Sequence, residues 1–98
     1  MDYQEDWSTR ATNDLKAAYE YVRRSNPDAA EAVISKIIDT ISLLHGSPRL
    51  GSLFLLRDDQ EIRQIVAGSF RIFYMPADAD ESLRIMTIQH VKRADPEF

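Results

Sequence analysis

The chain has 98 residues, enough for one domain with one hydrophobic core, and its 44% hydrophobic and 29% charged residues are typical of a globular protein. It contains no cysteine, which excludes disulfides and thiolate metal sites and fits a reducing cytoplasm, and its two histidines form no metal-ligand pattern, so we expect neither metal nor other cofactor. No run of about 18 apolar residues predicts a membrane span, and the acidic N-terminus lacks the apolar segment of a signal peptide. The formal net charge of −4 argues against nucleic acid as the main ligand, although a local basic patch is compatible with it.

The N-terminal part of the chain predicts a short strand and a helix. Tyr3, Glu5 and Trp7 would share one face of the strand, because alternate residues of a strand point the same way. Ser8 suits a helix N-cap, since its hydroxyl can accept a bond from a free amide of the first turn. Apolar residues then recur at helical spacing, which predicts an amphipathic helix that ends near Ser25.

A second helix should follow almost at once. Asn26 fits its N-cap and Pro27 its first position, where a missing amide costs nothing. The apolar stripe between Ala30 and Leu44 has the i, i+3, i+4, i+7 spacing of a half-buried helix and is the strongest pattern in the sequence. Gly46 is expected to end it. The short link between the two helices predicts an antiparallel hairpin.

The period then changes to that of strands. Three strands are predicted in "EIRQIVAG", "SFRIFYM" and "SLRIMTIQHV", whereas "SLFLL" is short, is followed by the charged "RDDQ", and is not counted as a strand. The short links permit only antiparallel pairing of these strands. The predicted fold is therefore a single α+β domain over residues 1–98, in the order β-α-α-β-β-β, with the helical hairpin packed on one face of a mostly antiparallel sheet.

Both faces of the predicted strands are largely apolar, yet one helical hairpin can cover only one face. Simple alternation places Ile72 and Ile85 on one face and Phe73 and Ile88 on the other. An exposed apolar face of this kind marks a partner site, unless residues 51–60 fold across it. The expected binding surface consists of the residues pointing away from the helices and the cations that follow them, namely Arg71, Phe73, Met75, Met86, Ile88, His90, Lys92 and Arg93.

Five segments in this order resemble the ParE/RelE superfamily of toxin–antitoxin toxins over nearly the whole chain. They are Trp7–Leu15, Asn26–Ala30, Ser47–Gly51, Gly68–Tyr74 and Ile88–Arg93. The fourth, "GSFRIFY", resembles the family's Gly-x-aromatic-Arg-apolar-apolar-Tyr strand, and the fifth departs from it, since Val91 stands where glycine is common. The resemblance implies a small bacterial toxin that is neutralised by a cognate antitoxin, ParD-like or of another type. Nucleic-acid binding is then expected only through the antitoxin.

Two activities occur among the proteins that the chain resembles. RelE-like members are ribosome-dependent mRNA endonucleases, which here would use Arg71, His90 and Arg93, since the reaction needs cations for a developing pentavalent phosphate and a group that moves a proton. ParE-like members bind and inhibit DNA gyrase and would need no catalytic residues. The tail ends in Phe98, whose side chain has no titratable group, and the net charge of the chain is negative. The ParE-like activity is therefore favoured, with a non-toxic co-repressor as a third possibility.

Each candidate residue also has a structural interpretation. Arg71 could pair with a carboxylate such as Glu61 or Asp59, because exposed strand arginines often do no more. His90 could be a structural side chain at the end of the sheet. The cations at positions 92 and 93 could be plain surface charge, or together with His90 they could receive an acidic partner segment.

Overall fold

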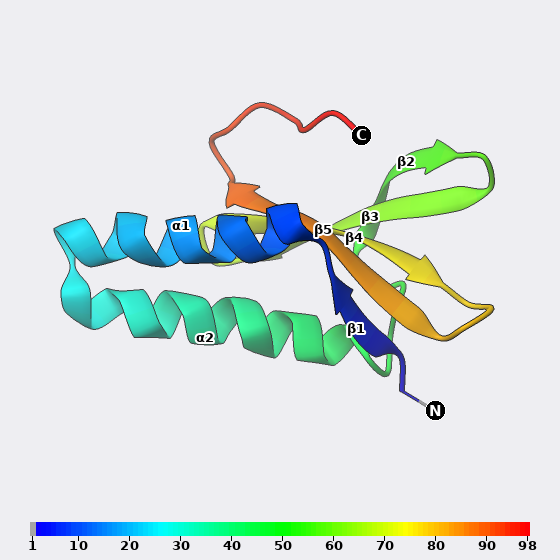
Figure 1. Ribbon diagram of the computed structural model, residues 1–98, viewed down its shortest axis with the longest axis horizontal. Coiled ribbons are helices and arrows are strands. Elements are labelled where there is room, and N and C mark those ends of the chain that lie inside the picture. The colour runs from blue at the N-terminus through cyan, green and yellow to red at the C-terminus, as the bar shows by residue number, and fades with distance from the viewer. Residues whose placement is uncertain (1) are drawn as a thin grey trace.

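The structure, a computed structural model, describes residues 2–98 and has a five-stranded sheet with two helices (Figure 1). The elements are β1 (Gln4–Trp7), α1 (Thr9–Ser25), α2 (Pro27–Leu44), β2 (Ser52–Arg57), β3 (Gln60–Ala67), β4 (Phe70–Ala77) and β5 (Ser82–His90). The predicted α+β class and the helical hairpin are confirmed. The predicted strand count is one short, because "SLFLL" forms β2 and pairs with β3.

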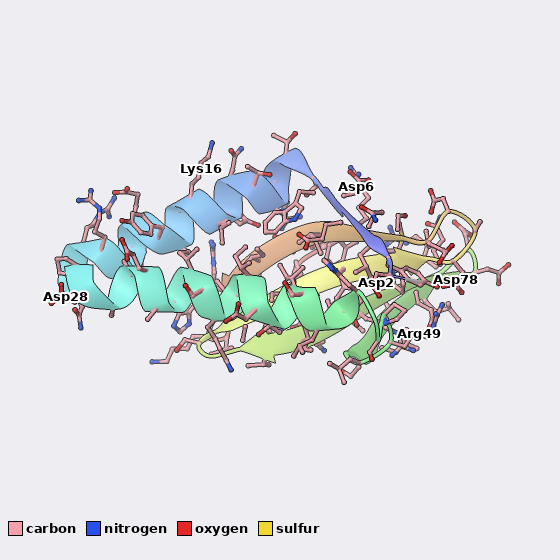
Figure 2. The ribbon with its side chains drawn as sticks, turned by 90° about the horizontal axis from the view of Figure 1, so that it is seen from below. Asp2, Asp6, Lys16, Asp28, Arg49 and Asp78 are labelled. Atoms are coloured by element: carbon pink, nitrogen blue, oxygen red, sulfur yellow. The ribbon has the colours of Figure 1, made fainter. Side chains whose placement is uncertain are left out.

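The strand order is β1-β5-β4-β3-β2. The pairs β3–β4 and β4–β5 are antiparallel, as the short links predicted. The pair β2–β3 is antiparallel as well, whereas β1 runs parallel to β5 at the edge of the sheet. The two helices lie side by side across one face of this sheet (Figure 2). The sheet is therefore covered by helices on one face only, as expected.

Both helix starts are made by the predicted caps. The Ser8 hydroxyl accepts a bond from the amide of Ala11 at 3.0 Å and donates one to the carbonyl of Met86 at 2.8 Å, so it also joins the start of α1 to β5. The Asn26 side chain accepts from the amide of Ala29 at 3.2 Å. Each cap contributes about 1 kcal/mol by occupying an amide that has no partner within the helix.

The core lies between the helices and the sheet. Its fully buried side chains include Ile37, Ile41 and Leu44 from α2 and Tyr74 and Ile85 from the sheet. The helical contribution comes from the apolar stripe that defined α2 in the sequence. Burying each such side chain contributes roughly 1.5–3 kcal/mol, so this layer is the main source of stability.

An extra residue in β5 changes which side chains face the helices. Phe73 lies opposite Thr87 and Tyr74 lies opposite Ile85, so Met86 has no partner on β4 and forms a bulge. Beyond the bulge the alternation is reversed, because one extra residue moves the following side chains to the other face. Ile88 therefore packs in the core with Ile85 and is 3% exposed. The prediction that Ile88 points away from the helices is wrong.

Part of the second face of the sheet, around Phe73, is also covered, by the C-terminal segment of the same chain. Residues 91–98 follow β5 and pass over the sheet on the side away from α2 (Figure 1). The ring of Phe98 packs against Phe54 and Phe73, with centroids 6.1 and 5.8 Å apart, and Phe73 is completely buried. The prediction of an exposed apolar face is therefore wrong, since the tail shields apolar side chains that would otherwise meet water. The segment 51–60 contributes Phe54 to this cover, but as part of the sheet edge.

Candidate functional site

The C-terminal segment encloses Arg71 on the face of the sheet opposite the helices. One terminal nitrogen, Nη1, lies 2.9 Å from Oδ1 of Asp95, and the other, Nη2, donates to the carbonyl of Arg93 at 3.1 Å. The guanidinium carbon lies 4.9 Å from the centre of the Phe73 ring. The Arg71 side chain is only 14% exposed, and its Nε is buried with no hydrogen-bond partner among residues 2–98. The expected pairing with a carboxylate is correct in kind, but the partner is Asp95.

A groove opens on the other side of β5, between that strand and α1. It has a volume of about 490 Å³. Its lining combines an apolar floor with polar and basic side chains at the rim, from Asp14, Ala17, Ala18, Tyr21, Phe70, Ile88, Gln89, His90, Lys92 and Arg93. His90 at the end of β5 and the two cations that follow this strand, Lys92 and Arg93, are thus gathered at one groove. An acidic partner segment with apolar side chains would be complementary to it.

Asp14 fixes the wall of this groove. Its carboxylate accepts hydrogen bonds from the hydroxyl of Thr87 and, at 3.0 Å, from the amide of Ile88. The Ile88 amide lies beyond the end of β1, whose pairing with β5 stops at Ile85, so no strand is available to satisfy it. Sequence reasoning missed this residue. The signal was its position three residues after Ala11 on the buried stripe of α1, where an acidic side chain needs a partner.

The predicted binding residues fall into two groups on different surfaces. Arg71 and Phe73 lie under the tail, and the half-buried Met75 belongs to the same face of β4. The second group lines the groove and consists of His90, Lys92 and Arg93, with Ile88 in its floor. Met86 is the half-buried bulge residue.

Arg71 and His90 point to opposite faces of the sheet. Arg71 pairs with Gln89, whereas His90 pairs with Phe70, and neighbouring residues of a strand alternate between faces. The His90 ring lies edge-on to Phe70 at 5.5 Å, and its Nδ1 accepts from the amide of Lys92 at 3.1 Å. The two residues that a RelE-like reaction would need around one phosphate are therefore separated by the sheet.

A network of ion pairs lies at the opposite end of the sheet (Figure 2). Arg49 bonds Asp78 through two nitrogens, at 3.0 and 3.1 Å, and Glu61 through Nε at 2.8 Å. The hydrogen bonds from Arg49 and from the Tyr3 hydroxyl hold the pKa of Asp78 below its usual value. The pKa of Glu61 is lowered by bonds from Arg63 and Arg49. These groups satisfy one another, so the network is structural. It joins the residue before β1, the link between α2 and β2, the strand β3 and the β4–β5 turn.

Two further kinds of site were sought among residues 2–98. No group of three histidine, aspartate or glutamate side chains is arranged to hold a metal ion. No helix in this part of the chain is long and apolar enough to cross a membrane.

Comparison with known proteins identifies relatives of both the sequence and the fold. The family model described as "ParE toxin of type II toxin-antitoxin system, parDE" matches residues 6–95. No curated protein sequence gives a significant match.

Solved structures of toxin–antitoxin systems share the fold. A chain of the chromosomal ParDE system from P. aeruginosa aligns with a TM-score of 0.74 at 17% identity, covering 92% of this chain and 97% of that one. The archaeal RelE–RelB complex from Pyrococcus horikoshii gives 0.73 at 14% identity, covering 96% and 100%. The RelBE2 complex from Mycobacterium tuberculosis gives 0.64 at 24% identity, covering 97% and 95%. At these identities the structures show a common fold only.

Proposed function

Because the chain belongs to the ParE toxin family of type II toxin–antitoxin systems, we propose that it acts by binding and inhibiting DNA gyrase. A cognate antitoxin, ParD-like or of another type, holds it inactive until the antitoxin is lost. This action takes place in the cytoplasm and requires no cofactor. The family match over residues 6–95 supports the assignment as a toxin. The choice of gyrase over the ribosome rests on the geometry of the candidate residues.

The observation that carries this choice is the separation of Arg71 from His90. Cleavage of RNA requires a cation and a proton carrier around the same phosphate. Here Arg71 is bonded to the tail on one face of the sheet, and His90 packs on Phe70 at the other face. This arrangement favours action by binding over the RelE-like alternative with Arg71, His90 and Arg93.

The basic groove is the surface that we assign to the target. His90, Lys92 and Arg93 surround an apolar floor, so an acidic segment could place apolar side chains in the groove and carboxylates at its rim. Lys92 and Arg93 are exposed, so they can meet a partner without any rearrangement of the core.

A supercoiling assay with purified protein tests the proposal. We expect the chain to inhibit DNA gyrase and the double variant Lys92→Ala/Arg93→Ala to need about tenfold more protein for the same inhibition, because the basic rim is lost. The matched control is Arg23→Ala/Arg24→Ala, which removes the same charge from the last turn of α1, where neither residue lines the groove. Normal supercoiling at all concentrations of the wild-type protein would reject gyrase as the target. If ribosomes were also unaffected, the non-toxic co-repressor would take its place.

A further inference from the structure

The helical hairpin carries a second groove, which we call the hairpin groove. It has a volume of about 460 Å³ and is lined by four residues of α1 and one of α2, namely Leu15, Lys16, Tyr19, Glu20 and Ile34. None of these residues lines the basic groove. The hairpin projects beyond the sheet at the end where the two helices meet (Figure 1). Another molecule can therefore approach this part of the hairpin without meeting the sheet.

The floor of the hairpin groove is apolar. Leu15, Tyr19 and Ile34 are each only half-buried. Ile38 follows Ile34 by one turn on the same face of α2 and is 39% exposed. The four side chains form an apolar patch that the single chain leaves in contact with water. Contiguous apolar surface of this kind favours burial against another molecule.

Two side chains of opposite charge border this floor. Lys16 and Glu20 are exposed and lie one turn apart on α1, and Figure 2 shows Lys16 pointing away from the sheet. Lys16 forms no ion pair among residues 2–98, and a lysine four residues before a glutamate is the less favourable order for a pair within one helix. Glu20 accepts a bond from Arg23 at 2.8 Å through Oε2, which leaves Oε1 for another cation.

We propose that the hairpin groove is the interface of a symmetric dimer, in which a second copy of this chain packs its hairpin on the first. A two-fold axis that passes α1 between Lys16 and Glu20 makes the two α1 helices antiparallel. It places Lys16 of each copy against Glu20 of the other, with the apolar floors in contact between them. An acidic segment, a basic segment or the phosphates of a nucleic acid would instead meet one like charge. This inference goes beyond the proposed function and does not depend on it.

The size of the hairpin sets the strength of this association. The helices α1 and α2 have 17 and 18 residues, so each is about 25 Å long and about 10 Å across. Their outer face therefore presents roughly 500 Å² per copy, or about 1,000 Å² for both, which is at the lower limit for a specific interface. We expect a weak dimer that dissociates in the micromolar range of concentration.

Sedimentation equilibrium of the purified full chain between about 1 and about 500 μM tests the dimer, since the mass should double within this range. Lys16→Glu places two acidic groups at each groove and should weaken the dimer at least about tenfold, because like charges then face each other. The matched control is Lys36→Glu, which makes the same change of charge at an exposed position of α2 that does not line the groove. This control should form dimers as the wild type does.

A mixture of two variants distinguishes a contact between copies from an effect within one copy. Glu20→Lys alone should also weaken the dimer at least about tenfold, because each groove then carries two basic groups. An equimolar mixture of Lys16→Glu and Glu20→Lys should associate about as strongly as the wild type, since an acidic groove then faces a basic one. Mixing cannot repair a structural defect within either variant. If a charge variant fails to fold, Ile38→Ser, at an exposed apolar position, should weaken the dimer about tenfold.

Three results would overturn the proposal. The first is a wild-type chain that stays monomeric at every concentration, which would leave the hairpin groove to a different protein. The second is a dimer that is as strong in the folded Lys16→Glu or Ile38→Ser variant as in the wild type. The third is a mixture of the two charge variants that stays monomeric under conditions where the wild type forms dimers.

Discussion

The hydrogen bonds of Asp14 provide the sharpest test of how the groove is built. In the structure the carboxylate accepts from the Thr87 hydroxyl and the Ile88 amide, and both of those residues are buried. Asp14→Ala removes both bonds and leaves a buried amide with no partner. A hydrogen bond to a charged group contributes about 1.5–3 kcal/mol, but Asp14 is partly exposed and water can replace part of the loss. We therefore expect the free energy of unfolding to fall by roughly 2–3 kcal/mol.

Urea unfolding followed by circular dichroism measures this loss. For a domain of this size the melting temperature should fall by about 8–24 °C, at about 4–8 °C for each kcal/mol. The neighbouring Asn13→Ala is the control, because Asn13 is exposed and should change the stability by less than about 0.5 kcal/mol. Thr87→Val should lower the free energy of unfolding by less in the Asp14→Ala background than in the wild type, because the hydrogen bond between Thr87 and Asp14 is already absent there. An Asp14→Ala protein as stable as Asn13→Ala would refute the role given to this carboxylate.

Two further predictions concern the end of the sheet away from the groove. Tyr74→Phe should lower the free energy of unfolding, measured in urea, by about 1–3 kcal/mol. The buried Tyr74 hydroxyl accepts a hydrogen bond from the amide of Gly51 at 2.9 Å, and its loss leaves that amide unpaired. Unchanged stability would contradict this prediction. The depressed pKa of Asp78, which arises chiefly from its bonds with Arg49, means that its contribution to stability is present above the unfolded-state pKa and is lost as pH falls through the folded-state value. Unfolding measured from about pH 6 down to about pH 2 should show a smaller acid-induced loss of stability in Arg49→Gln than in the wild type, and equal losses would count against the network.

The helical half of the fold was predictable because its determinants are local. The apolar stripe between Ala30 and Leu44 and the caps at Ser8 and Asn26 each act within a few residues, and all are found as expected. The strand β2 was missed because its turn to β3 uses Asp58 and Asp59, both with positive φ, where the familiar turn sequences contain glycine.

The candidate site was less predictable because it depends on contacts between distant segments. A bulge such as that at Met86 leaves no mark in the pattern of the strand itself, so alternation placed Ile88 on the wrong face. The role of Phe98 in covering Phe73 was likewise hidden, since a terminal aromatic residue can as well lie free in solvent. The sequence offered Arg71 as a candidate, but its burial under the tail follows only from the folded chain.

The central claim is that the chain acts by binding, because Arg71 and His90 lie on opposite faces of the sheet and do not form one site. Mapping the ends of an mRNA translated in the presence of the purified protein tests it most directly. The account predicts that, at protein concentrations that inhibit gyrase, the mRNA shows no more cuts than in a reaction without the protein. The account would be contradicted by mRNA cuts that are in phase with the codons, that are absent with the Arg71→Ala protein and that remain with the Arg23→Ala protein.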